Sequence, residues 1–293
     1  MDIASYLLGK NSSGGGGGEI PTKGVVFNEW DENGHPTNID VYGFTATNIS
    51  YFATTNATSS NTGGVTSRVK TVNFHDGSNM VSLGENTFYY MVNLESVNGL
   101  TNSQITIIPA SCFQNCVKLT TFPFSTSNGI TGIQQNAFNL CNKMSLTELP
   151  SSLTTIGASA FYGCNGIAIS RLPDNLTSLG TNCFDSCTSI KTMDLNNFSG
   201  VVPSNCFASN SLVSVYAPNV TGAYGAGTAN GAFRSCRYLV AIWFGSNITS
   251  SNMGRYVFNQ DTRLQKIYID LPRATTHLDI HMLLTERYIT MVI

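Results

Sequence analysis

The chain has 293 residues, enough to bury a sizeable core, and its composition is polar but almost uncharged. Only 11% of its residues are Asp, Glu, Lys or Arg, against roughly 25% in an ordinary soluble protein. The net charge of -2 provides no overall basic field, so we set nucleic-acid binding aside. No apolar stretch approaches the roughly 18 residues of a membrane span, and residues 1–10 lack the pattern of a secretory signal. We therefore expect no membrane insertion and no ordinary secretion.

The sequence of residues 1–18 predicts a short docking helix followed by a glycine-rich tether. Ile3, Tyr6 and Leu7 recur at helical spacing and give a short helix one apolar face, which is too small to be stable without a host surface. The following NSSGGGGG run is flexible, because glycine is costly to order and has no side chain to pack. We predict that this segment docks on a virion or surface protein, and the alternative is a low-complexity segment without a role.

Residues 19–80 have the pattern of a β-rich N-terminal capping region. Strand-like runs cover Gly24–Trp30, Ile39–Phe44 and Val69–Phe74, and Asn, Gly, Pro and Ser separate them. The last run already has the apolar spacing of the repeats that follow.

A repeat anchored on phenylalanine is the strongest signal in the sequence. The anchors recur every 23 to 26 residues: Phe88, Phe113, Phe138, Phe161, Phe184, Phe207, Phe233 and Phe258. Cysteine stands three residues after five of them: Cys116, Cys141, Cys164, Cys187 and Cys236. A unit of this length cannot close a core alone, so we predict a solenoid whose turns stack and bury an aligned phenylalanine column.

The segment Leu153–Cys164, with the sequence LTTIGASAFYGC, closely resembles the BspA-like leucine-rich repeat. The resemblance covers roughly residues 69–269. It implies an α/β repeat solenoid with a parallel β-sheet on one face and short helical or irregular segments on the other. About eight leucine-rich repeats then occupy residues 81–270, and residues 271–293 form a C-terminal cap. Such repeats occur in surface adhesins, microbial and parasite surface proteins and virion proteins, so the family implies recognition without a defined catalytic site.

Several rungs depart from this repeat. Asn210 and Asp261 replace the cysteine, and Thr147 and Ser170 take a place that is usually aliphatic. We expect local irregularity at those rungs.

The cysteines allow two other interpretations. Cys112 with Cys116, and Cys183 with Cys187, have the C-x-x-x-C spacing of a metal or redox pair. Zinc needs four ligands, however, and Cys112 and Cys183 occupy the slot before phenylalanine, which alanine or another small residue fills in other turns. We predict buried, reduced thiols that fill small core slots, and no metal site. A disulfide between neighbouring rungs is geometrically conceivable, but we expect none.

The C-terminal region holds one further candidate. His277 and His281 are four residues apart and could bind a metal together with Glu286. We favour exposed histidines on a terminal cap. The final run Tyr288–Ile293 is strand-like, and it either closes the solenoid edge or joins a second copy in a homo-oligomer. Since the chain has no nucleophile elbow, phosphate loop or H-E-x-x-H motif, we predict no catalytic residue, no cofactor and no enzymatic activity.

One strand position that faces solvent can be followed through all the repeats. It comprises Asn98, Pro123, Glu148, Arg171, Asp194, Tyr216, Trp243 and Tyr268. The last three rungs carry aromatic residues, and we predict that these bind a ligand, with Glu148, Arg171 and Asp194 as hydrogen-bonding neighbours. The alternative is that these rings are covered by another part of the assembly or only stabilise the strands.

These features predict a virion-displayed protein, non-enzymatic, that binds a host-surface glycan or protein through its solenoid. The opening MDIASYLLGK also loosely resembles bacteriophage tail or head accessory proteins. The alternatives are a BspA-type adhesin, extracellular or on a cell surface, and a structural subunit that cements the virion. A glycan depolymerase would need Glu148 and Asp194 to act together, yet they lie on separate rungs.

Overall fold

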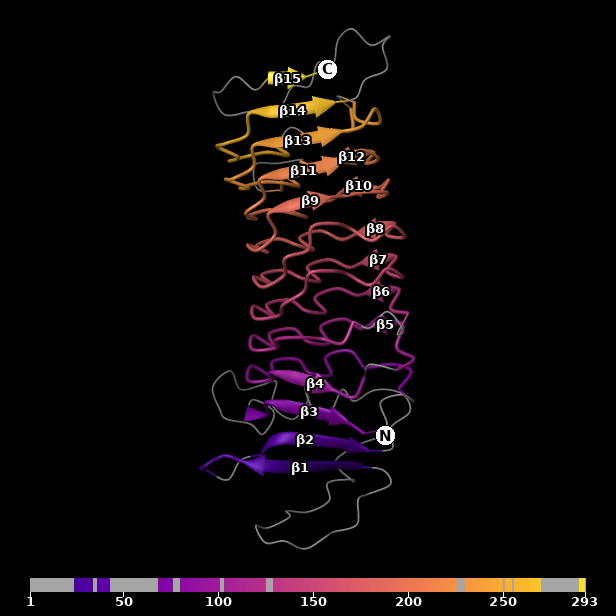
Figure 1. Cartoon of the computed structure of the whole chain (residues 1–293), viewed down its shortest axis with the longest axis vertical. Helices are drawn as coiled ribbons and strands as arrows, with labels where there is room; N and C mark the ends of the chain where they lie inside the picture. The colour runs from indigo at the N-terminus through magenta and orange to yellow at the C-terminus, as the bar shows by residue number, and fades with distance from the viewer. Residues whose placement is uncertain are drawn as a thin grey trace, which may run out of the picture.

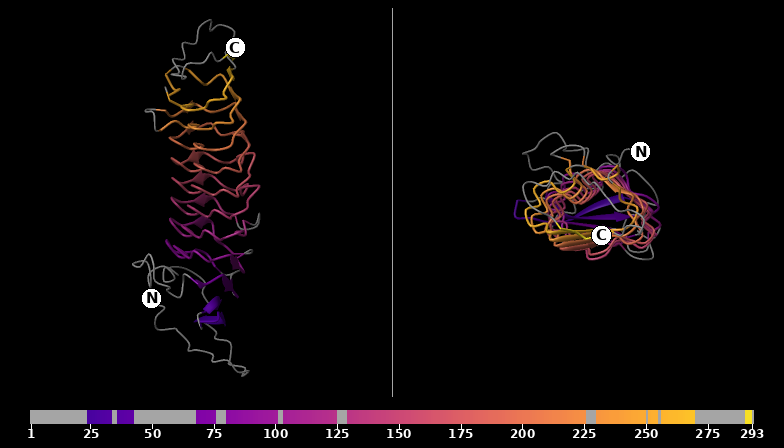
Figure 2. Two further views of the ribbon diagram at one scale, coloured as in Figure 1. Left: turned by 90° about the vertical axis from the view of Figure 1, so that its left-hand side faces the viewer. Right: turned by 90° about the horizontal axis from the view of Figure 1, so that it is seen from above.

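The structure, a computed structural model, is a solenoid (Figure 1). It describes residues 24–33, 36–42, 68–75, 80–100, 103–124, 129–225, 230–249, 251–254, 256–269 and 290–292. The turns stack along one long axis, and the view along that axis shows them nearly superposed (Figure 2). Each turn therefore packs mainly against its two neighbours, as the repeat predicted.

A sheet runs along one face of the solenoid, and we call it the front sheet. It begins with an antiparallel pair, and every later pairing in it is parallel. Its first part contains β1 (Gly24–Trp30), β2 (Pro36–Tyr42), β3 (Thr71–Phe74) and β4 (Ser96–Asn98). Its second part contains β9 (Thr192–Asp194), β11 (Ser214–Ala217), β13 (Ala241–Phe244), β14 (Lys266–Ile269) and β15 (Thr290–Val292). β15 pairs with β14, so the strand-like C-terminal run closes this edge.

A second wall is made of strands only two residues long. It contains β5 (Ile107–Ile108), β6 (Gly132–Ile133), β7 (Thr155–Ile156) and β8 (Ser178–Leu179), followed by β10 (Val201–Val202) and β12 (Gly222–Ala223). The strands pair in parallel, and the second residue of each is buried.

The turns around each anchor phenylalanine are irregular, not helical. No residue described between positions 80 and 269 is helical, so the α/β description overstated the helix content and the irregular alternative holds. The cause is a left-handed residue after each anchor phenylalanine, and in six of the eight turns also one before it, which interrupts a right-handed helix. Two residues before it, φ lies between 51 and 57° at Asn86, Ser111, Asn136, Ser159, Asn182 and Asn205. Two residues after it, φ lies between 55 and 69° at Tyr90, Asn115, Leu140, Gly163, Ser186, Ser209, Ser235 and Gln260.

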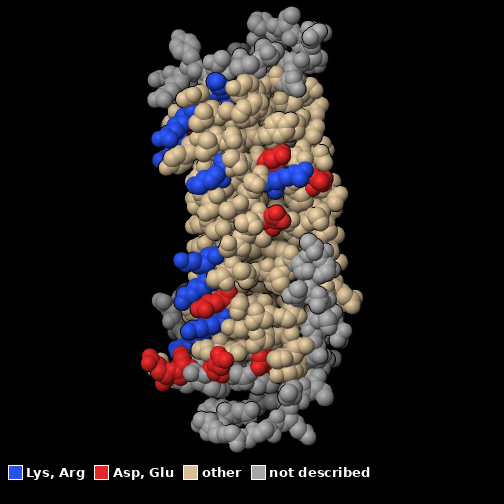
Figure 3. Space-filling view, in the orientation of Figure 1, with Lys and Arg blue, Asp and Glu red and all other residues tan. Residues whose placement is uncertain are grey.

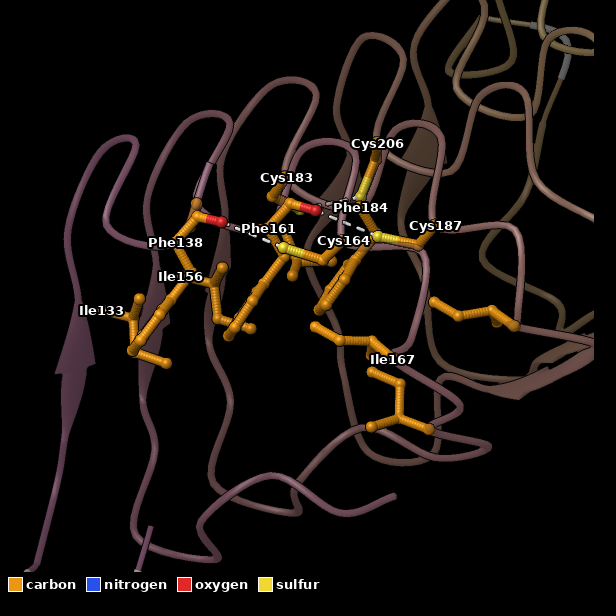
Figure 4. Close-up of a cluster of buried hydrophobic side chains, with 14 of the residues drawn as sticks. Ile133, Phe138, Ile156, Phe161, Cys164, Ile167, Cys183, Phe184, Cys187 and Cys206 are labelled. Carbon is orange, nitrogen blue, oxygen red and sulfur yellow. Dashed lines mark hydrogen bonds between the residues drawn. The ribbon is translucent and has the colours of Figure 1, made fainter. Parts of the chain in front are cut away.

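The core contains the predicted phenylalanine column. Successive rings stack with centroids 4.7–5.8 Å apart and planes within 2–16° of parallel. Beside the rings, the thiols of the column cysteines donate to phenylalanine carbonyls of the preceding turn; Cys164 Sγ, for example, lies 3.0 Å from Phe138 O (Figure 4). Burying each ring is worth about 1.5 to 3 kcal/mol, so the column is a main source of stability.

The front sheet is interrupted between β4 and β9, a stretch that includes two of the four rungs expected to be irregular, those of Thr147 and Ser170. The expectation was wrong for Asn210 and Asp261, whose turns continue into the regular strands β11 and β14. Thr147 and Ser170 are exposed, and the preceding residues Leu146 and Ile169 turn toward the core instead. Only isolated bridges remain here, such as that between Leu146 and Ile167. A polar residue at the aliphatic place thus shifts the buried position by one residue and breaks the strand.

Candidate functional site

The aromatic residues of the front sheet stand in one register column. The Cα partners along it are Arg171 with Asp194, Asp194 with Tyr216, Tyr216 with Trp243, and Trp243 with Tyr268. The alternate positions on the same strands, Val215, Ile242 and Ile267, are buried beneath the sheet. We call Tyr216, Trp243 and Tyr268 the aromatic stripe. The alternation of the strand therefore holds all three side chains on the outer face.

The three rings are not equivalent. Trp243 and Tyr268 stack with centroids 4.7 Å apart and planes 1° from parallel, and both are half-buried. Tyr216 is 52% exposed and makes no ring contact within the described residues. Because Trp243 and Tyr268 cover one face of each other, Tyr216 is the ring most open to a ligand.

Below the aromatic stripe lies a cluster of polar side chains. Arg171 Nη2 donates to Asp174 Oδ1 at 2.9 Å, and both side chains are more than half exposed. The Asn196 amide also donates to Asp174 Oδ1, and its backbone N–H donates to Asp194 Oδ1 at 2.7 Å. Arg171 and Asp194 are thus held by neighbours while remaining within reach of a ligand on the stripe.

Two members of this cluster were missed by sequence analysis. Asp174 and Asn196 lie in the loops that follow the strands, whereas the repeat register followed only strand positions. A search for Asp and Asn one to three residues after each aligned position would have found them. Glu148, by contrast, is exposed in the interrupted part of the sheet and belongs to no strand.

The aromatic stripe lies on the outer face of the front sheet. Two hollows lie elsewhere: one of about 660 Å³ is lined by Val81, Thr106 and Gln134, and one of about 330 Å³ by Val201, Tyr224 and Met253. An outer sheet face with projecting rings suits an extended partner better than an enclosed small molecule.

The cysteines are placed as core residues. All eight are free and buried, and burial raises the pKa of seven of them, Cys206 and Cys236 included, so these thiols stay neutral. A neutral buried thiol is neither a nucleophile nor a metal ligand. Within the described part of the chain, no three His, Cys, Asp or Glu residues gather in a way that could hold a metal ion.

Other candidates lie outside the described residues. These are Ile3, Tyr6 and Leu7 of the docking segment and His277, His281 and Glu286 of the C-terminal region. In the part that is described, no helix has the length and hydropathy needed to cross a membrane.

Comparisons with solved structures identify similar solenoids. A leucine-rich repeat protein from Bacteroides ovatus is 18% identical, with a TM-score of 0.54 over 86% of this chain and 71% of that one. A leucine-rich repeat protein from T. pallidum is 17% identical, with a TM-score of 0.42 over 79% of this chain and 87% of that one. A leucine-rich cell surface protein from Faecalibacterium prausnitzii is 16% identical, with a TM-score of 0.38 over 70% and 80%. No protein with a curated description matches the sequence.

The family model for the BspA type leucine-rich repeat region matches residues 37–130, 106–226 and 171–283. These matches together cover most of the sequence, including the front sheet from β2 to β14 and the whole phenylalanine column. With the stacked parallel turns described above, they identify the chain as a member of the BspA-type leucine-rich repeat family.

Proposed function

We propose that this protein is a non-enzymatic recognition protein that binds an extended partner, a glycan or a protein, on its aromatic stripe. The observation that supports this most is the alignment of Tyr216, Trp243 and Tyr268 in one register on the outer face of the front sheet, with Tyr216 exposed. Tyrosine and tryptophan dominate binding energy at interfaces, because they bury a large area at a low cost in side-chain entropy.

The solenoid also holds the stripe in a fixed position. The strands that carry it are joined by continuous parallel pairing from β9 to β15. Beneath them the buried side chains pack on the phenylalanine column. A site fixed in this way loses little conformational entropy when it binds, which raises affinity.

We infer that the protein is displayed outside the cell, on a cell surface or on a virion. Support for display comes from the BspA-type repeat and from the nearly uncharged outer surface, rich in Ser, Thr and Asn. The virion alternative depends on residues 1–18, which lie outside the described residues. The proposed binding role of the aromatic stripe is the same for display on a cell surface and for display on a virion.

The test is binding of the purified chain to a glycan array and to whole bacterial cells. The first variant is Tyr216→Ala, which removes the most exposed ring and leaves the Trp243–Tyr268 stack in place. The second variant adds Trp243→Ala and Tyr268→Ala. We expect the single variant to weaken binding about tenfold or more, as loss of an interface hot spot does, and the triple variant to abolish it.

The matched control is Tyr90→Ala/Tyr224→Ala. These tyrosines are 50% and 46% exposed but lie outside the front sheet, so their removal should leave binding intact. Circular dichroism checks that every variant is folded. If the control loses as much binding as Tyr216→Ala, or if wild type binds neither cells nor any arrayed glycan, the aromatic stripe is not the recognition site.

A further inference from the structure

Basic side chains gather along one edge of the front sheet, although the chain as a whole is slightly acidic. Figure 3 shows Lys and Arg following one side of the molecule over most of its length. By sequence position, the residues in the turns that lead into the front strands, or at the start of those strands, are Lys70, Lys118, Lys143, Lys191, Arg237, Arg263 and Lys266. We call these seven residues the basic edge.

The repeat places these residues on the same side of successive turns. Lys118, Lys143 and Arg263 all stand two residues after the cysteine slot, and Arg237 stands one residue after it. Lys70 and Lys191 immediately precede β3 and β9. At about 4.8 Å per turn, the row from Lys70 to Lys266 is roughly 40 Å long.

Among the described residues, no carboxylate forms an ion pair with the basic edge. All seven side chains belong to exposed residues, and none forms an ion pair within the described structure. Arg68 and Arg171, which lie outside the basic edge, do have carboxylate partners, namely Asp31 and Asp174. The exposed acidic residue Glu95 lies among these seven basic residues, and its backbone N–H donates to Lys70 O. Cations in a row without neighbouring carboxylates repel one another, and a bound polyanion reduces that repulsion.

The other groups on this edge are those that recognise sugars. Exposed Thr120, Ser145 and Thr188 present hydroxyls between the cations. Tyr238 is 51% exposed, and the Arg263 guanidinium lies 5.2 Å from its ring centroid. Hydroxyls that exchange hydrogen bonds, a half-exposed tyrosine ring and cations suit an acidic sugar chain.

We propose that the basic edge binds a linear polysaccharide that carries carboxylate or sulfate groups. Such a polymer is extended, so it can lie along the solenoid axis and meet one cation every one or two turns. The proposal does not depend on the function of the aromatic stripe, although the two surfaces adjoin on β14, where Lys266 stands two residues before Tyr268.

The test uses the full chain and four immobilised polymers: heparin for sulfate, polygalacturonate for carboxylate, neutral dextran, and single-stranded poly-dT as a nucleic acid. The variant is Lys143→Gln/Arg237→Gln, because neither side chain has a hydrogen-bond or ion-pair partner in the described structure. The control, Lys143→Arg/Arg237→Lys, changes the same two side chains but keeps both positive charges.

We expect wild type and control to bind heparin or polygalacturonate, or both, and to ignore dextran. For the edge variant, the slope of log affinity against log salt should fall by about one for each cation removed, a total of about two. Heparin alone would identify sulfate as the recognised group, and polygalacturonate alone would identify carboxylate. The proposal is overturned if neither acidic polysaccharide binds, if poly-dT binds more tightly than both, or if the two double variants weaken binding equally.

Discussion

The Sγ atoms of Cys183 and Cys206 lie 3.2 Å apart in neighbouring turns of the solenoid, and both side chains are completely buried. The contact joins two thiols and is not a disulfide. Burial raises the pKa of the Cys206 thiol, since the thiolate would lose its hydration there. Proximity alone therefore does not make the pair reactive, because both thiols are closed off from solvent and the Cys206 thiol stays neutral.

We predict that none of the eight cysteines reacts with a thiol reagent at pH 8 while the solenoid is folded, and that all eight react after denaturation. The measurement is titration with Ellman's reagent with and without guanidinium chloride. The Cys206→Ala variant is the control and should lower the denatured count by one. Rapid labelling of native wild type that this variant abolishes would show that the contact is open to solvent.

The carboxyl group of Asp261 occupies the slot that cysteine fills in other turns. Column residues there act as donors: Cys236 Sγ donates to Phe207 O at 3.0 Å, and Asn210 Nδ2 donates to Phe184 O at 2.8 Å. A carboxylate has no proton to donate, and both oxygens of Asp261 lack a hydrogen-bond partner. Burial raises the pKa of Asp261 to about 8, and the nearby Cys236 backbone and the positive charge of Arg234 oppose this rise without offsetting it.

The raised pKa of Asp261 predicts a pH-dependent stability. The folded chain holds this proton up to about pH 8, while the unfolded chain releases it near pH 4. Stability should therefore be greatest below the unfolded pKa, fall as pH rises through this window and level off above it. Urea unfolding across this pH range should show the fall for wild type and a weaker dependence for Asp261→Asn. Asp174→Asn, at an exposed carboxyl, should retain the wild-type dependence, and a matching loss in both variants would contradict this account.

The sequence predicted the features that recur at a fixed spacing. The phenylalanine column and the column from Arg171 to Tyr268 were found because each is filled in consecutive turns. The basic edge escaped because its members alternate between slots and skip turns, and a net charge near zero conceals their segregation. Apolar spacing left helical and irregular turns as alternatives, because it does not express the left-handed φ of residues such as Leu140, whose N–H donates to Tyr162 O of the next turn.

Gly180 stands at the glycine position of the repeat, one turn after Gly157, and the packing between turns explains why glycine is needed there. A Cβ atom on Gly180 would lie 2.2 Å from Ala158 N and 2.4 Å from Gly157 C, both backbone atoms of the preceding turn. The Gly180 N–H donates to Ile156 O at 2.7 Å, and this hydrogen bond holds the two backbones close together. Gly180 is therefore needed because no space is left for a side chain. The turns cannot separate here without losing that hydrogen bond.

We predict that Gly180→Ala destabilises the protein by about 3 kcal/mol or more, the upper end for overpacking, because the clash is with backbone. The control is Gly132→Ala, where the nearest atom to the new Cβ is Thr155 Oγ1 at 3.2 Å, a side-chain atom that can rotate away. That variant should cost less than about 1 kcal/mol. Urea unfolding followed by circular dichroism gives both values. An equal loss in the two variants would mean that the packing between turns at Gly180 is looser than these distances indicate, and that the I-G motif reflects another requirement of the turn.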